Sequence, residues 1–155
     1  MGDVSFDYDG ETVLVTGGSS GIGREVATAF AAAGAAVVVA DVREDPREPD
    51  GVPTHERIEA AGGQATYVET DVSDPGQIRE AVDVAGEFGG LDVMVNNAGT
   101  ADRKPLTEAT PEAFDRILGV NAHGVLFGTQ IAAADMLERG DPGVIVNTAS
   151  ISADL

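Results

Sequence analysis

The chain has 155 residues, of which 27 are acidic and 9 basic, giving a formal net charge of −18. Such an acidic surface repels nucleic acid and anionic membranes, and the absence of cysteine excludes disulfides and thiolate metal sites. With 43% hydrophobic residues, the chain is expected to form one globular domain with a single core.

The charge pattern and the N-terminus predict where the protein works. The carboxylates are spread along the chain instead of forming a tail, which is typical of proteins that stay soluble at high salt. We expect no stretch long and apolar enough to cross a membrane, and residues 1–10 lack both the positive and the apolar region of a signal peptide. We therefore expect a cytoplasmic protein that binds neither membrane nor nucleic acid.

The first predicted elements surround a cluster of glycines. A β-branched run over residues 13–15 predicts a strand, and a helical pattern over residues 21–33 follows, ending at Gly34. One face of this helix carries the apolar side chains Ile22, Val26, Ala29, Phe30 and Ala33.

A strand that ends in glycines where a helix begins is typical of pyrophosphate binding. Glycines allow close approach of the backbone, and the helix N-terminus supplies N–H donors and a positive dipole end. The P-loop is an alternative, but it needs Lys followed by Ser or Thr, where this chain has Arg24 and Glu25. The predicted cofactor-binding residues of this stretch are Gly17, Ser19, Ser20, Gly21, Ile22 and Gly23.

The rest of the chain alternates predicted strands and helices. Further strands are expected over residues 37–40, 66–68, 93–95 and 144–146. Thr54 is expected to cap a short helix, and Asp74-Pro75 and Thr110-Pro111 begin two more. The last helix is expected to be long, with Phe114, Ile117, Leu118 and Val125 on one apolar face.

Nearly continuous apolar strands separated by helices indicate an α/β fold in which both faces of a parallel sheet are covered. Polar residues follow the predicted strands at equivalent positions: Asp41, Asp71, residues 96–99 and Ser150. Each alone is explained by a turn or a helix cap. Together with the glycines they mark the carboxyl ends of five strands, where open α/β sheets bind ligands.

With these pieces in order, the chain resembles the short-chain dehydrogenase/reductase family. The matching pieces are residues 16–23, Asp41, residues 71–72, residues 96–99, Asn121 and residues 147–150. The resemblance implies a Rossmann-type doubly wound parallel sheet with strand order 3-2-1-4-5. It also implies an oxidoreductase that transfers a hydride between NAD(P) and a small-molecule alcohol or carbonyl substrate.

The resemblance implies roles for individual residues. Asp71, beside Val72, contacts the adenine edge, and Asn97, Ala98 and Gly99 line the adenosine ribose side and support the central strand. Ser150 hydrogen-bonds the reacting substrate oxygen.

Asn121 is the second residue expected to act in catalysis. By resemblance it distorts the long helix and holds a water of the proton relay. The alternative is a core asparagine whose amide joins two turns, because a buried amide must be hydrogen-bonded. No metal is expected, since His55 and His123 lack partners at metal-ligand spacing.

The cofactor is expected to be NAD, with NADP the less favoured alternative. Asp41 lies eighteen positions after Gly23, where an acidic side chain accepts hydrogen bonds from the ribose hydroxyls and repels a 2′-phosphate. Arg43 is a complication, since its side chain is long enough to reach such a phosphate.

The family carries Tyr-x-x-x-Lys soon after the catalytic serine, and this chain stops at Leu155. Tyr8 and Tyr67 do not supply the motif, because Thr12 and Asp71 stand four residues later. We therefore expect residues 1–155 to be a C-terminally incomplete NAD(P)-binding Rossmann domain of a homodimeric or homotetrameric enzyme. A complete, non-catalytic dinucleotide-binding protein is the alternative. The acidic composition further predicts a halophilic archaeal source.

Overall fold

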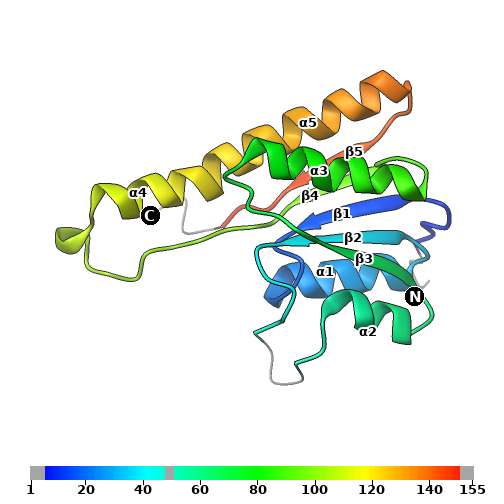
Figure 1. The fold of residues 1–155 in the computed structure, drawn as a ribbon, viewed down its shortest axis with the longest axis horizontal. Helices are drawn as coiled ribbons and strands as arrows, with labels where there is room; N and C mark the ends of the chain where they lie inside the picture. Colours follow the sequence, from blue (N-terminus) through cyan, green and yellow to red (C-terminus); the bar gives the residue numbers. More distant parts are fainter. Residues whose placement is uncertain (1–5, 48–50, 151–155) are drawn as a thin grey trace, which may run out of the picture.

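The computed structural model describes residues 6–47 and 51–150. It contains a five-stranded parallel sheet in the order β3-β2-β1-β4-β5, with helices on both faces (Figure 1). The predicted α/β class, the parallel pairing and the strand order are therefore confirmed.

The polar residues Asp41, Asp71, Asn97 and Ser150 lie at a strand end or within three residues after one. The strands are β1 (Thr12–Thr16), β2 (Ala36–Asp41), β3 (Gln64–Glu69), β4 (Val93–Asn96) and β5 (Val144–Asn147). The helices are α1 (Gly21–Ala32), α2 (Thr54–Ala60), α3 (Pro75–Ala85), α4 (Pro111–Leu118) and α5 (Gly124–Arg139). Short 3-10 turns lie at η1 (Gly86–Phe88) and η2 (Leu106–Glu108), and η3 (Gly119–His123) is a π-helical turn between α4 and α5.

The sheet separates two apolar clusters, one on each face. Alternate residues of β1 point to opposite faces, so Val13 and Val15 join one cluster and Leu14 joins the other. Helices α1 and α2 cover the first cluster through Ala27 and Ile58. Helices α3 and α5 cover the second, as Figure 1 shows. Continuous apolar strands thus fill both layers.

The apolar stripe of α1 noted in the sequence packs on the sheet only in part. The buried residues of α1 are Gly23, Arg24 and Ala27, whereas Ile22 is 69% exposed. The helix approaches the glycine-rich turn closely: a Cβ on Gly23 would lie 2.1 Å from the carbonyl oxygen of Gly17. Within the stripe, Val26 and Phe30 are half-buried and pack against the first cluster.

Thr54 does not cap α2, contrary to the sequence prediction. The N-cap residue is Pro53, and no side chain makes a cap hydrogen bond there. Thr54 is the first residue of the helix, and its hydroxyl is directed to a distant segment described below. The other two predicted caps are present, since Asp74 accepts from the Gly76 N–H and Thr110 from the Ala113 N–H.

The long helix after Thr110 is interrupted by the π-turn η3 and then continues through α5. Its predicted apolar face is only partly buried: Phe114 is 58% and Leu118 38% exposed. The contacts with α3 and β4 come instead from α5, whose buried residues include Ile131, Ala132 and Met136.

The expectation that no stretch is long and apolar enough to cross a membrane is wrong. The helical stretch Pro111–Arg139 spans 29 residues and meets that description by length and composition, the one such stretch within residues 6–47 and 51–150. The predicted apolar face ends at Val125, whereas the helical stretch continues to Arg139. Because one side of α5 packs on α3 and β4, as in the core helices of folded domains, length and composition are weak grounds for a membrane span.

Candidate functional site

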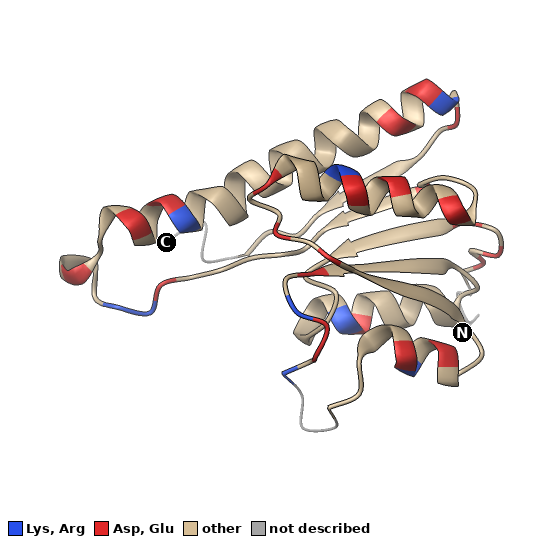
Figure 2. Cartoon of the chain, in the orientation of Figure 1, with Lys and Arg blue, Asp and Glu red and all other residues tan. Residues whose placement is uncertain are grey.

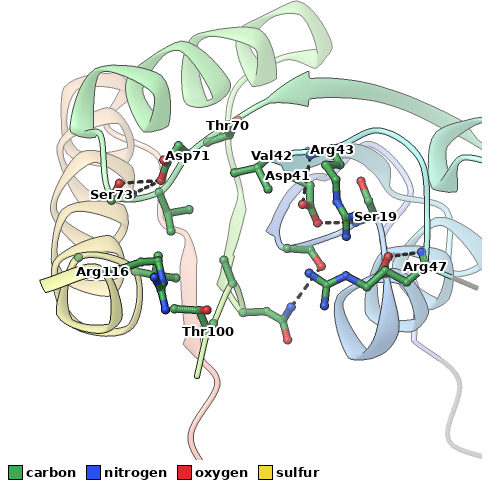
Figure 3. Close-up of a pocket in the computed structure, with 18 of the residues that line it drawn as sticks. Ser19, Asp41, Val42, Arg43, Arg47, Thr70, Asp71, Ser73, Thr100 and Arg116 are labelled. Atoms are coloured by element: carbon green, nitrogen blue, oxygen red, sulfur yellow. Dashed lines mark hydrogen bonds between the residues drawn. The ribbon is translucent and has the colours of Figure 1, made fainter. Parts of the chain in front are cut away.

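A cavity of about 460 Å³ opens at the carboxyl ends of the strands (Figure 3). Segments that follow β1, β2, β3 and β4 line it, together with part of α4 and η3. It brings together nine of the residues predicted to bind a cofactor: Gly17, Ser19, Ser20, Asp41, Asp71, Val72, Asn97, Ala98 and Gly99.

The glycine-rich turn between β1 and α1 forms one wall of the cavity. The N–H groups of Gly17 and Gly18 both donate to the carbonyl of Ala40, at 2.8 and 3.3 Å, which ties the turn to the end of β2. Gly17 and Gly21 have φ angles of +65° and +57°, a conformation that favours glycine. A Cβ on Gly17 would lie 2.9 Å from Ala98 Cα, whereas a Cβ on Gly21 would meet no protein atom within 4 Å.

The buried hydroxyl of Ser19 indicates whether the turn fits a dinucleotide. Its side chain is 1% exposed, and its Oγ has no hydrogen-bond partner among the described residues. Buried hydroxyls nearly always have a partner, so a group from outside the chain fits this position. The turn also leaves open space over Gly21 at the start of α1, where helix N–H groups attract phosphate. These features fit the pyrophosphate of a dinucleotide.

Asp41 stands at the end of β2, and main-chain donors hold its carboxylate. Oδ2 accepts from the Ser19 N–H at 3.1 Å, and Oδ1 from the Arg43 N–H at 3.4 Å. The Tyr67 hydroxyl donates to the Asp41 carbonyl at 2.9 Å, which fixes the same residue from the side of β3. Burial, followed by the nearby carboxylates of Glu69, Asp41 and Glu44, raises the pKa of Tyr67 to about 12.

Three arginines also line the cavity, and sequence reasoning assigned only one of them a possible contact. Arg43 and Arg47 come from the segment after β2, and Arg116 comes from α4 (Figure 3). The N–H of Arg47 donates to Ser20 Oγ at 2.8 Å, so this segment folds back onto the glycine-rich turn. The sequence signal for Arg47 and Arg116 is the scarcity of basic residues, of which the chain has only nine. Their position at the cavity is known only from the structure.

The ends of β3 and β4 complete the opposite wall. Asp71 Oδ1 accepts from both the N–H and the hydroxyl of Ser73, at 2.9 and 2.7 Å, which holds the carboxylate at the cavity. Asn97 lies against the end of β1: its N–H donates to Thr16 Oγ1, and its Nδ2 donates to the Thr16 carbonyl, both at 3.0 Å. The Thr16 hydroxyl thus joins the two central strands where the cavity opens.

Asn121 lies within the π-turn and outside the cavity lining. Its Oδ1 accepts from the Thr100 N–H and its Nδ2 donates to the Thr100 carbonyl, both at 2.8 Å. The side chain is exposed, so Asn121 is not a core residue, although its amide does join two segments. The helix is distorted at Asn121, and π-turns of this kind are frequent at functional sites.

The remaining predicted residues are not part of the cavity lining. Ser150 is exposed and follows the end of β5 by three residues. Gly21, Ile22 and Gly23 form the start of α1, with Gly23 buried beneath the turn and the other two exposed. Within the described part of the chain, no three His, Cys, Asp or Glu side chains are grouped to hold a metal ion.

Comparisons with known proteins agree with this geometry. Residues 11–155 match the family model described as short chain dehydrogenase. The chain is 43% identical over 144 residues to L-2,3-butanediol dehydrogenase of Corynebacterium glutamicum, covering 92% of this chain and 55% of that protein. It is 37% identical over 145 residues to 3beta-hydroxysteroid dehydrogenase 2 of Eggerthella lenta, covering 92% and 54%.

Solved structures give the same result in three dimensions. A crystal structure of a short-chain type dehydrogenase/reductase from Mycobacterium marinum matches with a TM-score of 0.88 and 38% sequence identity. The match covers 97% of this chain and 60% of that one. The chain therefore spans about half the length of the curated relatives it matches.

Proposed function

The chain belongs to the short-chain dehydrogenase family, and on that premise we propose that it binds the cofactor of an oxidoreductase acting on a small alcohol or carbonyl compound. The supporting observation is the convergence of nine of the twelve predicted cofactor residues on one cavity. We take residues 1–155 as one NAD(P)-binding Rossmann domain, which spans about half the length of the curated relatives. A bound nicotinamide dinucleotide would supply or accept the hydride.

Each wall of the cavity has a role in this proposal. The glycine-rich turn and the Ser19 hydroxyl hold the pyrophosphate, and Asp41 accepts hydrogen bonds from the adenosine ribose. Asp71 and Val72 take the adenine. Ser150 orients the reacting oxygen of the substrate, and Asn121 maintains the turn that orders the proton-relay water.

NAD is the proposed cofactor, because Asp41 places a carboxylate where NADP carries its 2′-phosphate. Arg43 and Arg47 oppose this preference, since both line the same end of the cavity. The carboxylate is held by two main-chain N–H groups, which favours it as the fixed partner of the ribose hydroxyls.

Calorimetric titration of the full-length protein with NAD and NADP tests the proposal. We expect NAD to bind at least tenfold more tightly, and Asp41→Asn to reduce that preference by removing the repulsion of the 2′-phosphate. Arg116→Gln, which changes a cationic residue on a different wall, is the control and should leave the NAD:NADP ratio unchanged. Tighter binding of NADP by the unchanged protein would contradict the assignment.

The other candidate is a non-catalytic dinucleotide-binding protein. Turnover distinguishes it from a dehydrogenase: the full-length protein should oxidise or reduce at least one member of a panel of secondary alcohols and ketones. Cofactor binding without turnover on that panel would favour the non-catalytic role.

We further propose that the full-length protein is a homodimer or homotetramer in a high-salt cytoplasm, without nucleic-acid or membrane partners. The exposed apolar residues of α4 and α5, Phe114, Leu118 and Leu126, support the oligomer, because exposed apolar patches mark interaction sites. The net charge of −18 supports the high-salt setting. A halophilic archaeal source stays a prediction, and the relatives named above are bacterial.

A further inference from the structure

Thr54 belongs to a helix outside the cavity, yet its hydroxyl reaches the glycine-rich turn. The side chain is fully buried, with 0% exposure. Its Oγ1 lies 3.0 Å from the carbonyl oxygen of Gly18 and 3.2 Å from that of Ser19, and donates its hydrogen to this pair. A threonine at a helix start ordinarily bonds to its own helix. Here the partners are more than thirty positions earlier in the chain.

The two acceptors belong to consecutive peptide groups of the turn. Each peptide group is planar and trans, so fixing its carbonyl also fixes the N–H on its opposite side. The peptide that carries the Gly18 carbonyl also carries the Ser19 N–H, which donates to Asp41 Oδ2 at 3.1 Å. The next peptide carries the Ser20 N–H, which is therefore turned away from Thr54.

Arg24 ties the segment before Thr54 to the same region. Its side chain is 1% exposed on the buried face of α1, and its Nη1 donates to the Val52 carbonyl at 2.6 Å. Val52 lies two residues before Thr54, so the start of α2 is held from both the turn and the helix that follows it. The position of Thr54 against the turn is thus defined by its own buried hydrogen bonds and by the partly buried bond between Arg24 and Val52.

We propose that Thr54 is a positioning residue for the dinucleotide site. Its hydroxyl holds two peptide planes of the glycine-rich turn, which aims the Ser19 N–H at the Asp41 carboxylate and keeps the Ser20 N–H turned away from α2. Thr54 touches no cofactor itself, and acts through Ser19 and Asp41. This inference rests on the proposed dinucleotide-binding function.

The test compares Thr54→Val, which keeps the shape of the side chain and loses the donor, with Thr54→Ser, which keeps the donor. Thr28→Val is the matched control, because the Thr28 hydroxyl donates to the Arg24 carbonyl within α1, away from the turn. Each full-length variant is titrated with NAD by calorimetry, and its free energy of unfolding is measured in urea.

Thr54→Val should weaken NAD binding about three- to tenfold, the effect expected for the loss of one hydrogen bond. Thr54→Ser and Thr28→Val should bind as the unchanged protein does. In an Asp41→Ala background, which lacks the acceptor of the Ser19 N–H, Thr54→Val should cost less than twofold, because the two residues act through one contact. Should Thr54→Val not fold, Thr54→Cys takes its place, since a thiol is only a weak donor.

The outcomes separate this inference from the function on which it rests. The positioning role is contradicted if Thr54→Val leaves the NAD affinity unchanged, or if Thr28→Val lowers it equally. In both cases the proposed dinucleotide-binding function still stands. The same holds if the loss persists in full in the Asp41→Ala background. Absence of NAD binding by the unchanged protein contradicts the proposed function, and the inference with it.

Discussion

Strands β2 and β5 have similar apolar sequences and differ sharply in burial. In β2, Val37, Val38 and Val39 are at most 1% exposed, whereas in β5 Val144 is 56% and Val146 43% exposed. The difference comes from their neighbours. Strand β2 lies between β1 and β3 with helices over both faces, whereas β5, within the described residues, pairs only with β4. An apolar sequence thus predicts a strand, but the burial of that strand depends on the elements that pack around it.

The helices repeat the same contrast. The buried face of α5 packs on α3 and β4 through residues such as Ala132. Its opposite side carries Leu126 and Leu137, which are 61% and 81% exposed. Apolar side chains on the two sides of one helix therefore contribute differently to stability, and unfolding measurements can show this directly.

A matched pair of leucine substitutions should give the largest difference. Leu14, at the centre of β1, is 0% exposed, and Leu14→Ala should lower the free energy of unfolding by about 2–5 kcal/mol through lost burial and the cavity left behind. Leu137→Ala should change it by less than about 0.5 kcal/mol, as surface substitutions generally do. Urea unfolding of both variants measures the contrast. Similar losses at the two sites would mean that Leu137 is buried in the protein as it exists in solution.

The same contrast explains which predictions the sequence supports. The strand order is implied by the family resemblance and is confirmed by the structure. The meeting of Asp41, Asp71 and Asn97 follows from parallel pairing, because the carboxyl ends of parallel strands share one edge of the sheet. Local patterns of this kind are readable along the chain. They do not predict which residues, distant in sequence, contact a given residue in the folded chain.

Thr54 and Phe114 show where sequence reasoning ends. A threonine before a helical pattern predicts a cap, and nothing near Thr54 in the sequence encodes a hydrogen bond to Gly18. A phenylalanine at helical spacing predicts a buried face, yet Phe114 is 58% exposed because no described segment covers α4 there. Both outcomes depend on partners distant in sequence.

Salt should change stability by a smaller amount than the core substitution. The acidic residues lie mainly on the helices and connecting segments, and the charged residues in the described strands are the last residues of β2 and β3, Asp41 and Glu69 (Figure 2). Raising ionic strength from 0.1 to 1 M shortens the Debye length from about 10 to about 3 Å and screens their repulsion. The melting temperature, followed by circular dichroism, should therefore rise by several degrees between dilute buffer and molar KCl. An unchanged melting temperature would contradict the high-salt proposal.

The smallest expected effect concerns Tyr67, on the well-covered side of the sheet. Its pKa is raised to about 12 in the folded chain, by burial first and then by Glu69, Asp41 and Glu44, against an ordinary value of 10. Between pH 10 and 12 the unfolded chain therefore binds fewer protons than the folded one, and the free energy of unfolding falls as pH rises. The neutral phenol contributes its full stabilisation below pH 10 and loses it as pH passes 12.

Tyr67→Phe removes this titration together with the hydrogen bond to the Asp41 carbonyl. The variant should be about 0.5–1.5 kcal/mol less stable than the unchanged protein at pH 9, the usual net value of one hydrogen bond, and this gap should shrink as the pH approaches 12. Tyr8→Phe is the control, because Tyr8 packs edge-on against Phe30 and its replacement leaves Tyr67 in place. Urea unfolding at pH 9, 10, 11 and 12 measures all three proteins. A gap that stays constant across this range would show that Tyr67 ionises equally in the folded and unfolded chain, and that burial on the covered side of the sheet does not hold its proton.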